Sequence, residues 1–471
     1  MVNITDDLEN IQPGSKKNGN SACPVRRLAS GEKTRYITRQ RSWSNRKVFQ
    51  MRYDNCISDI LSSIQLPRIP DHEIVLQAVS GEEIRGKVMQ AVADCTQHGG
   101  GRIVIPPGSF RCNGPIHLQS HIELHFSEGC FLKFSPEPAL YLPQVFTRWE
   151  GVELFNYSPM IYGIGLTDVA ITGKGVIAGG SEIRQAWRNL QKPAQERSRC
   201  LEENHVPVKE RLFGPADYLR PAMLQLIRTE RILLEDLTLT DNAFWMVHPV
   251  YCRDLTIRRL NLDCMLVNND GIDLDSCENA LIEDSVFRNG DDAIVIKSGR
   301  DQDGLRVGKP TRRVVIRNCV FAEVIHGIAI GSELSGGAEE IYVQDVDMET
   351  VYCEAISFKS TRGRGGVIRD IHLENIRIGT AGRHFICIDN DYSKINHGDA
   401  LTLFKDITIR NVFCGWAKQA FRLQGKPELP LENIRIENVT VDRADVLYEL
   451  DEYAEDVRFE QVSVNGQPVV R

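Results

Sequence analysis

The sequence contains few aromatic side chains and no long hydrophobic run. Aromatic residues make up 7% of the 471 residues, and no stretch approaches the 18 consecutive apolar positions that suggest a membrane-spanning helix. The 13 cysteines include no CxxC pair, which excludes zinc-ribbon spacing, and we expect them to be buried small side chains rather than a disulfide framework. Glycine, with 37 residues, and β-branched side chains are plentiful, which favours strands and turns over helical bundles.

Charge is spread unevenly along the chain. The net charge of −8 argues against nonspecific nucleic-acid binding as the main role. Residues 1–50 carry ten Lys and Arg against four Asp and Glu and show no hydrophobic periodicity. We therefore expect a disordered or poorly structured arm over residues 1–59 and one folded domain over residues 60–471, with neither nucleic acid nor membrane as a partner.

The opening residues also lack the apolar core of a secretory signal peptide, which spans about 7–15 residues. Read literally, the chain stays in the cytoplasm. A misassigned start would make it periplasmic or secreted.

One pattern of alternating apolar and polar residues, ending in a short polar turn, recurs along most of the chain. One apolar position in each copy serves as a marker, and successive markers are 23, 25, 34, 27, 30, 36, 27 and 23 residues apart. These markers are Leu234, Ile257, Ile282, Ile316, Val343, Leu373, Ile409, Ile436 and Phe459. A period of this length, extended where loops are inserted, suits one coil of a right-handed parallel β-helix, whose coils must stack to bury a continuous apolar core.

We therefore predict an all-β fold, a single-domain right-handed parallel β-helix with an N-terminal capping helix over residues 83–97. A leucine-rich repeat would need a consensus that is absent, and a propeller would need longer, four-stranded units. Residues 181–214 interrupt the repeats and are expected to form a polar, helix-prone excursion on the surface. Asparagines recur at the turns, where they tolerate a left-handed backbone and can form a ladder along the stack. They are Asn318, Asn375, Asn411 and Asn438.

Carboxylates gather on neighbouring predicted coils. Asp270 is followed 21 residues later by Asp291 and then Asp292, a lag close to one coil, which corresponds to a rung spacing of ~4.8 Å. His326 follows about one coil further on once an inserted loop is omitted, and Lys359 follows 33 residues later. The spacing predicts that these five side chains form a ladder on one face of the solenoid.

The residue types in this ladder indicate acid–base chemistry. Clustered carboxylates repel one another when ionised, so one keeps a proton with a raised pKa while another stays charged. A proton donor and a water-activating base on opposite sides of a glycosidic bond, roughly 6.5–9.5 Å apart, are the arrangement of an inverting glycosidase. His326 would tune the donor, and Lys359 would hold an anionic sugar. The same oxygens also suit a Ca²⁺ site, and Asp273 and Asp275 also suit a plain turn.

These residues make the chain resemble glycoside hydrolase family 28, the polygalacturonase family. The resemblance covers residues 99–344, with weaker similarity to the C-terminus, and stretches such as GGGRIVIPPGSF, IKSGRDQDG and IGSELSGG resemble its bacterial, often exo-acting branch. The family elements Asn-Thr-Asp, Gly-Asp-Asp, Gly-His-Gly and Arg-Ile-Lys appear here as Asn268-Asn269-Asp270, Gly290-Asp291-Asp292, Ile325-His326-Gly327 and Ser357-Phe358-Lys359.

The resemblance implies hydrolysis of α-1,4-galacturonide bonds in a pectic poly- or oligosaccharide, with inversion and with neither a cofactor nor a metal. Asp291 would be the general acid, and Asp270 and Asp292 would activate the attacking water. His326 would maintain the protonation of the acid. The residues expected to bind substrate are Asn268, Lys297, Arg300, Lys359, Arg362 and Arg364.

The chain also departs from the family pattern. Ser357 replaces an arginine, which removes a bidentate carboxylate clamp, so either Arg362 or Arg364 compensates or the substrate is rhamnogalacturonan or a decorated pectic oligosaccharide. Long segments over residues 181–214 and 299–310 favour an exo mode by closing one end of a cleft. A Ca²⁺-dependent pectate lyase and a noncatalytic carbohydrate-binding β-helix remain as alternatives, and the sequence assigns no oligomeric state.

Overall fold

The computed structural model describes residues 53–393 and 398–470. The chain divides into two units, Met1–Asp59 and Ile60–Arg471. Of the predicted arm, residues 1–52 lie outside the described residues, whereas residues 53–59 are helical.

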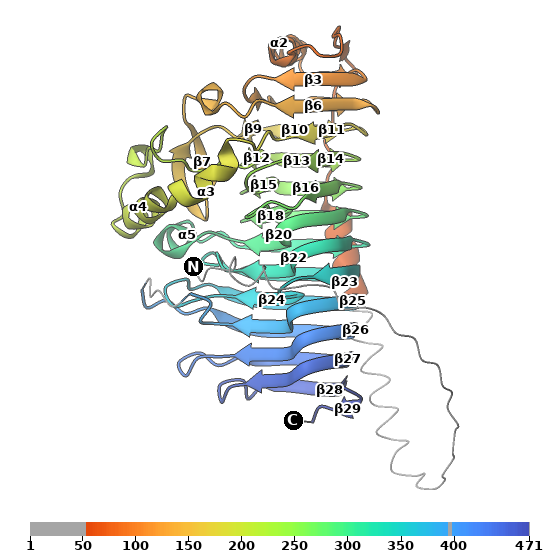
Figure 1. The fold of residues 1–471 in the computed structure, drawn as a ribbon, viewed down its shortest axis with the longest axis vertical. Coiled ribbons are helices and arrows are strands. Elements are labelled where there is room, and N and C mark those ends of the chain that lie inside the picture. The colour runs from red at the N-terminus through yellow and green to blue at the C-terminus, as the bar shows by residue number, and fades with distance from the viewer. Residues whose placement is uncertain (1–52, 394–397, 471) are drawn as a thin grey trace, which may run out of the picture. The chain divides into compact units, whose positions relative to one another are not determined.

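The second unit is a parallel β-helix in which strands pair from coil to coil in three stacks (Figure 1). The first stack contains β1 (Glu73–Val75), β2 (Gly101–Ile105), β5 (Ile122–Phe126), β10 (Thr167–Thr172), β13 (Glu230–Glu235), β16 (Arg253–Arg258), β19 (Glu278–Glu283), β21 (Thr311–Arg317) and the first parts of β23 (Ala338–Val351), β25 (Val367–Asp389), β26 (Leu403–Gln424), β27 (Glu432–Leu450) and β28 (Val457–Val464).

The second and third stacks follow the first around each coil. The second contains β3 (Gly108–Cys112), β6 (Cys130–Phe134), β11 (Val176–Ala178), β14 (Thr238–Thr240), β17 (Asn261–Cys264), the first parts of β20 (Val286–Lys297) and β22 (Val320–Gly331), and later parts of the longer strands. The third contains β4 (Ile116–His117), β9 (Ile161–Ile164), β12 (Leu224–Ile227), β15 (Val247–Val250), β18 (Ile272–Asp275), the ends of β20 and β22, β24 (Ile356–Lys359) and the ends of β25 and β26.

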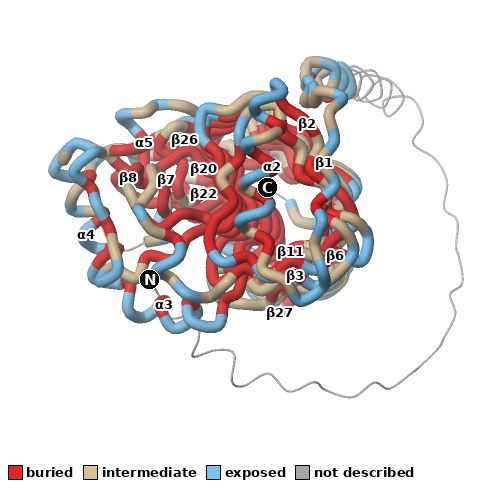
Figure 2. Tube along the Cα trace, turned by 90° about the horizontal axis from the view of Figure 1, so that it is seen from above, coloured by how far each residue is buried: buried red, intermediate tan, exposed pale blue. Residues whose placement is uncertain are grey.

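The predicted β-helix is confirmed down to its register. The nine repeat markers pair directly in succession in the first stack, in eight pairs from Leu234 with Ile257 to Ile436 with Phe459. These side chains are buried, and buried segments run through the middle of the solenoid when it is viewed along its length (Figure 2). The alternation of apolar and polar residues therefore sets which side of every strand faces the interior.

The turns between the first and second stacks repeat one backbone conformation. Asn318, Asn375, Asn411 and Asn438 all have a positive φ, between 51° and 56°. The side-chain amide of Asn438 donates to Asn411 at 2.8 Å, and that of Asn411 donates to Asn375 at 3.3 Å. Asparagine meets both needs of this position because it tolerates the left-handed region and can hydrogen-bond to its counterpart one coil away.

The N-terminal end of the solenoid carries the helix that the sequence predicts. Helix α2 (Arg85–Gln97) buries Val88, Val92 and Cys95 in the same core cluster as the first coils (Figure 1). At the C-terminal end, β29 (Gln467–Pro468) folds back antiparallel to β28. Helix α2 covers the apolar interior of the first coil, which would otherwise be open to water.

The predicted excursion projects from one side of the solenoid (Figure 1). It contains η4 (Arg184–Ala186), α3 (Trp187–Leu190), α4 (Lys192–Glu203) and η5 (Val208–Glu210). Helix α4 contacts α5 (Asp301–Val307) and the antiparallel hairpin formed by β7 (Val145–Trp149) and β8 (Val152–Asn156). The short element η3 (Pro138–Tyr141) precedes this hairpin. A buried ion pair between Arg148 and Asp275, with Nη1 and Oδ1 2.9 Å apart, joins the hairpin to the third stack.

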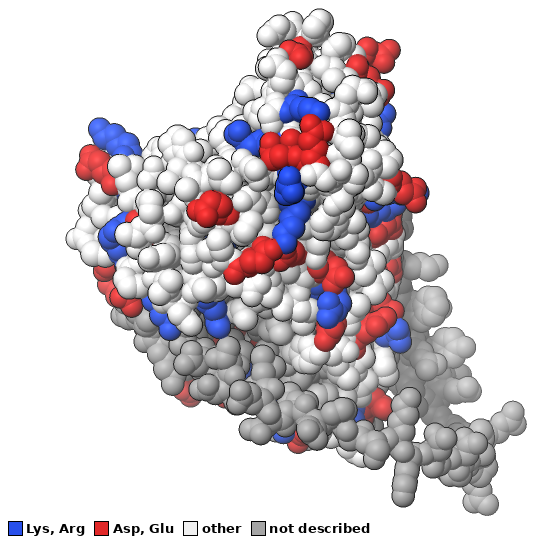
Figure 3. All heavy atoms as spheres, turned by 45° about the horizontal axis from the view of Figure 1, so that its top comes forward, with Lys and Arg blue, Asp and Glu red and all other residues white. Residues whose placement is uncertain are grey.

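Acidic and basic side chains are interspersed on the face of the molecule that Figure 3 shows. Charged side chains also pair between coils: Arg312 lies 2.7 Å from Glu278, and Arg369 lies 2.6 Å from Glu339. This mixture leaves that face without a broad patch of one sign. Within the described residues, no helix is long and apolar enough to cross a membrane.

Candidate active site

The structure brings the predicted carboxylates and histidine together at the start of the third stack. Asp270 precedes β18, Asp291 and Asp292 lie within β20, and His326 lies in β22, directly paired with Asp292. One side-chain atom from each of Asp291, Asp292 and His326 lies within 4.8 Å of the others. Asp291 and His326, which are 35 positions apart in the sequence, therefore lie in one cluster.

Two glycines allow the backbone to bend at this cluster. The pairing of β20 with β22 is irregular between Asn289 and Asp292, where the chain turns from the second stack into the third. A Cβ on Gly290 would lie 2.1 Å from the carbonyl oxygen of Leu266, and one on Gly271 would lie 2.5 Å from that of Ala293. Both positions require glycine because the adjacent coil approaches the backbone too closely for any side chain.

Lys359 is bound to Asp292. Its Nζ donates to Oδ1 at 2.9 Å and to Oδ2 at 3.0 Å, and both side chains are buried. Lys359 lies on the coil after His326, as predicted, but pairs with Gly331 rather than with His326. Its long side chain reaches back across one coil to the carboxylate.

Asp291 is less enclosed and has different partners. The amide of Asn268 donates to its Oδ2 at 3.2 Å, while the carbonyl oxygen of that amide accepts from Arg220 at 2.8 Å. Asn268, expected to bind substrate, thus holds Asp291 in the structure. The buried Arg220 fixes the orientation of the amide.

Asp270 belongs to a second, more deeply buried group of charges. The Nζ of Lys297 lies 3.4 Å from Asp270, 2.9 Å from Asp273 and 3.7 Å from Glu333, and 3.4 Å from the centre of the Trp245 ring. Lys297, expected to contact substrate, is therefore engaged by three carboxylates beneath the cluster. Asp273 lies within β18 and is fully buried, so it does not merely mark a turn.

These surroundings separate the pKa values of the three aspartates. Burial, followed by the charge of Asp292, raises the pKa of Asp291. Burial alone would also raise the pKa of Asp292, but the positive charges of Lys359, His326 and Lys297 together lower it. Burial and the charge of Asp273 raise the pKa of Asp270 well above its usual value. The site thus favours a proton on Asp291 and Asp270 and a negative charge on Asp292.

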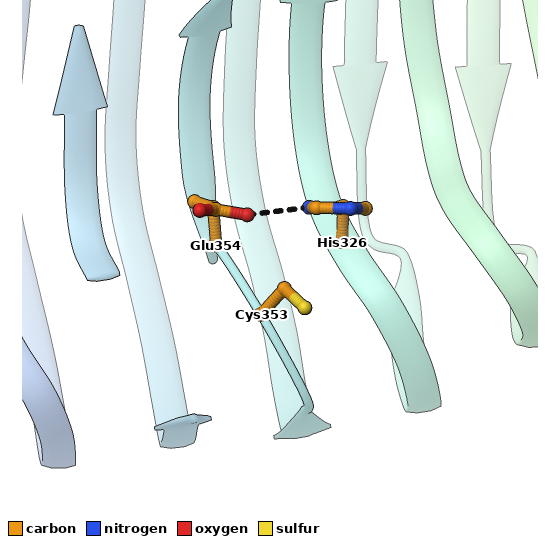
Figure 4. Close-up of side chains that lie close together, drawn as sticks. All are labelled: His326, Cys353 and Glu354. Atoms are coloured by element: carbon orange, nitrogen blue, oxygen red, sulfur yellow. Dashed lines mark ion pairs between the residues drawn. The ribbon is translucent and has the colours of Figure 1, made fainter. Parts of the chain in front are cut away.

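His326 has a partner that the sequence motifs do not reveal. Its Nδ1 lies 2.8 Å from Oε2 of Glu354 on the next coil, and the two side chains point toward each other with Cys353 nearby (Figure 4). The other oxygen of Glu354 accepts from Nδ1 of His384 at 3.0 Å. The lag of 28 residues from His326 to Glu354 is a possible sequence signal, since it is close to one coil.

The remaining predicted substrate contacts are held by carboxylates. Arg300 lies 3.2 Å from Asp301, and Arg364 is ion-paired with that same carboxylate while donating to the carbonyl oxygen of Ser332 at 2.8 Å. Arg362 pairs with Glu428 at 2.7 Å. Their contact with substrate stays a prediction.

Ser357, the position where the family has arginine, is 1% exposed and paired in register with Ala329 and Cys387. Small side chains thus occupy three successive coils at this position. Tyr392, which the sequence analysis did not single out, lies near Lys359, whose Nζ is 5.7 Å from the centre of its ring.

The donor chemistry of the cluster suits protons better than a metal ion. Both oxygens of Asp292 already accept from Lys359, whereas Ca²⁺ takes six to eight oxygen ligands. His326, Cys353 and Glu354 offer nitrogen, sulfur and oxygen atoms within 4.8 Å of one another. However, Nδ1 of His326 already faces Glu354, and burial raises the pKa of the Cys353 thiol to about 12, which disfavours the thiolate that a metal would bind.

The sequence and the fold both match known proteins. The chain matches the family described as Glycosyl hydrolases family 28 over residues 216–457. A probable polygalacturonase of Vitis vinifera is 30% identical over 380 residues, which cover 77% of this chain and 72% of that protein. An exo-poly-alpha-D-galacturonosidase of Dickeya chrysanthemi is 20% identical over 356 residues, which cover 69% of this chain and 58% of that protein.

Solved structures extend the comparison to the fold. A hyperthermoactive exopolygalacturonase from Thermotoga maritima superposes with a TM-score of 0.83 at 32% identity, covering 88% of this chain and 96% of that one. A polygalacturonase from Erwinia carotovora ssp. carotovora has the same fold, with a TM-score of 0.60 at 20% identity, covering 85% and 98%. The resemblance seen in the motifs is confirmed, and the chain belongs to glycosyl hydrolases family 28 and is a glycoside hydrolase.

Proposed function

We propose that this enzyme hydrolyses α-1,4-galacturonide linkages of pectic chains, releasing product from a chain end with inversion at the anomeric carbon. The observation that carries this proposal is that Asp291, whose pKa is raised, and Asp292, whose pKa is lowered, lie with His326 in one cluster on a family 28 β-helix. Hydrolysis of an acetal bond by water requires an acid that protonates the leaving oxygen and a base that activates the attacking water.

Asp291 is the general acid of this mechanism. It is the more exposed member of the aspartate pair, and its raised pKa lets it carry a proton to the leaving oxygen. The hydrogen bond from Asn268 fixes its carboxyl group. A positively charged His326 lowers the pKa of Asp291, so its charge alone does not preserve this proton.

Asp292 is the base that activates the attacking water. Lys359 keeps it ionised, and the charge on His326 acts in the same direction. Burial and the charge of Asp273 raise the pKa of Asp270 well above its usual value, so this carboxyl group is a poorer base than Asp292. Asp270 therefore orients the water, while Asp292 accepts the proton.

An exo mode is supported by what lies beside the site and by the relatives. Helices α3, α4 and α5 and the β7–β8 hairpin project next to the third stack (Figure 1). The hairpin is joined to the coil of β18 by the buried pair of Arg148 with Asp275, and Arg300 donates its backbone N–H to Gly151 at 3.1 Å. Such a rigid wall would block a polymer from passing through the site. The Thermotoga maritima relative is an exopolygalacturonase.

Product profiling on defined pectic oligosaccharides tests the proposal. We expect short uronates to accumulate from polygalacturonate while viscosity falls slowly, and the first-formed product to have the inverted anomeric configuration. Rapid viscosity loss at low bond cleavage would contradict the exo mode. An unsaturated product, or loss of activity with a chelator, would indicate a lyase instead. The same panel should include rhamnogalacturonan and decorated oligosaccharides, because Ser357 replaces the family arginine that would bind a substrate carboxylate.

A further inference from the structure

Acidic and basic side chains alternate along one row of the third stack, beyond the residues used by the mechanism. Asp292 pairs with His326, the backbone N–H of Gly327 donates to Glu354, and that of Ala355 donates to His384. The row Asp292, His326, Glu354 and His384 therefore crosses four successive coils. Each of these side chains is less than 10% exposed.

The side chains of this row are joined as well as stacked. Nδ1 of His326 lies 2.8 Å from Oε2 of Glu354 (Figure 4). Nδ1 of His384 lies 3.0 Å from Oε1 of Glu354. Arg383 adds a positive charge 3.4 Å from Oε1. Both oxygens of the buried carboxylate are thus occupied, one of them by the histidine of the active site.

The charges around His326 come from the coils on either side of it and oppose one another. Burial and the charge of Lys359 lower the pKa of His326, whereas the hydrogen bond and charge of Glu354 and the charge of Asp292 raise it, with a net increase. Glu354 has a pKa well below its usual value because its bonds to the two histidines outweigh its burial. The balance that keeps His326 positive therefore depends on a residue that lies outside the aspartate cluster.

We propose that Glu354 is a positioning residue for hydrolysis: it holds Nδ1 of His326 as a donor, retains the imidazolium beside Asp292, and is itself held by His384. A carboxylate that accepts from one ring nitrogen fixes both the tautomer and the orientation of a histidine. Glu354 then acts on the reaction through His326 and not by touching the sugar. This inference rests on the proposed role of the cluster in catalysis.

The test is the isosteric change Glu354→Gln, which removes the charge and preserves the shape. We expect the pKa of the His326 ring, followed by NMR, to fall by about 1 unit or more. Because a positive His326 lowers the pKa of Asp291, the earlier loss of that charge should move the basic limb of the kcat/KM profile to higher pH. Glu374→Gln is the matched control, since Glu374 is also buried and bound to a cation, Arg410 at 2.6 Å, in the first stack. Glu374→Gln should change neither the pKa of His326 nor the pH profile of kcat/KM.

A second pair of variants keeps the proposal falsifiable if Glu354→Gln does not fold. His384→Asn retains a donor for Oε1 and should resemble the wild type, whereas His384→Ala should shift the basic limb upward, as Glu354→Gln does. An unchanged His326 titration in folded Glu354→Gln, or equal profiles for the two His384 variants, would overturn the proposal. The NMR reading does not depend on turnover, so a shifted His326 in a protein inactive on every pectic substrate would separate failure of the proposed function from failure of this inference.

Discussion

A substitution of Lys359 tests most directly whether this lysine keeps the pKa of Asp292 low. Its Nζ bonds both oxygens of Asp292, at 2.9 and 3.0 Å, in a buried setting. An opposite charge this close lowers the pKa of a carboxyl group by about 1–3 units, each worth about 1.4 kcal/mol. In Lys359→Met the side chain keeps its length and loses its charge, so only His326 and Lys297 still oppose the effect of burial, and the pKa of Asp292 should rise by that amount.

The assay is the pH profile of kcat/KM, measured by the release of reducing ends. If ionised Asp292 is the base, the acidic limb should move upward by about 1–3 units, and activity below the new limb should fall about tenfold per pH unit. Lys309→Met is a suitable control, since Lys309 donates to the carbonyl oxygen of Tyr251 at 3.1 Å, outside the cluster. A higher KM with an unmoved acidic limb would refute the reasoning and leave Lys359 as a substrate contact alone.

The other predictions concern the general acid Asp291, the β7–β8 hairpin held by Arg148, and the backbone bend at Gly290. Asp291→Asn should lower kcat by at least about 10²-fold with an unchanged melting temperature, and near-normal turnover would exclude Asp291 as the acid. Arg148→Met should cost about 3–5 kcal/mol in the free energy of unfolding, measured with denaturant, because it leaves Asp275 buried without its arginine. The pKa of Asp275 is lowered in the folded state, so the ion pair stabilises the fold above the unfolded pKa near 3.9, and this stabilisation is lost as the pH falls. The Arg148→Met variant should therefore unfold at a higher pH than the wild type during acid titration. An unchanged acid-unfolding midpoint would argue against this role of the pair. Gly290→Ala should destabilise the fold by about 1–3 kcal/mol, whereas Gly86→Ala, where a Cβ meets nothing within 4 Å, should not; equal melting temperatures would contradict the close approach of the coils at residue 290.

Much of the active site follows from the repeat. Because a strand pair in a solenoid fixes the neighbour of every residue one coil away, the lag of 21 residues places Asp270 beside the Asp291–Asp292 pair. The same arithmetic places Lys359 on the correct coil but not at the correct position along its strand, since it pairs with Gly331. Counting coils cannot measure how far a long side chain reaches.

The partners of the cluster were harder to foresee. Glu354 and His384 carry no motif, and Lys297 is held by Asp273 and by Glu333 from a loop. These contacts depend on loop paths and side-chain rotamers, which the period of the repeat does not encode. These contacts also influence the pKa values of the aspartates and therefore which carboxyl group is protonated.

The sequence by itself determined the coil, its register and the gathering of three aspartates, because alternating apolar residues can be buried in only one register when coils stack. The tertiary structure alone decided which charges surround each aspartate, since burial and distances of a few ångströms set the pKa values and neither is a property of residue order.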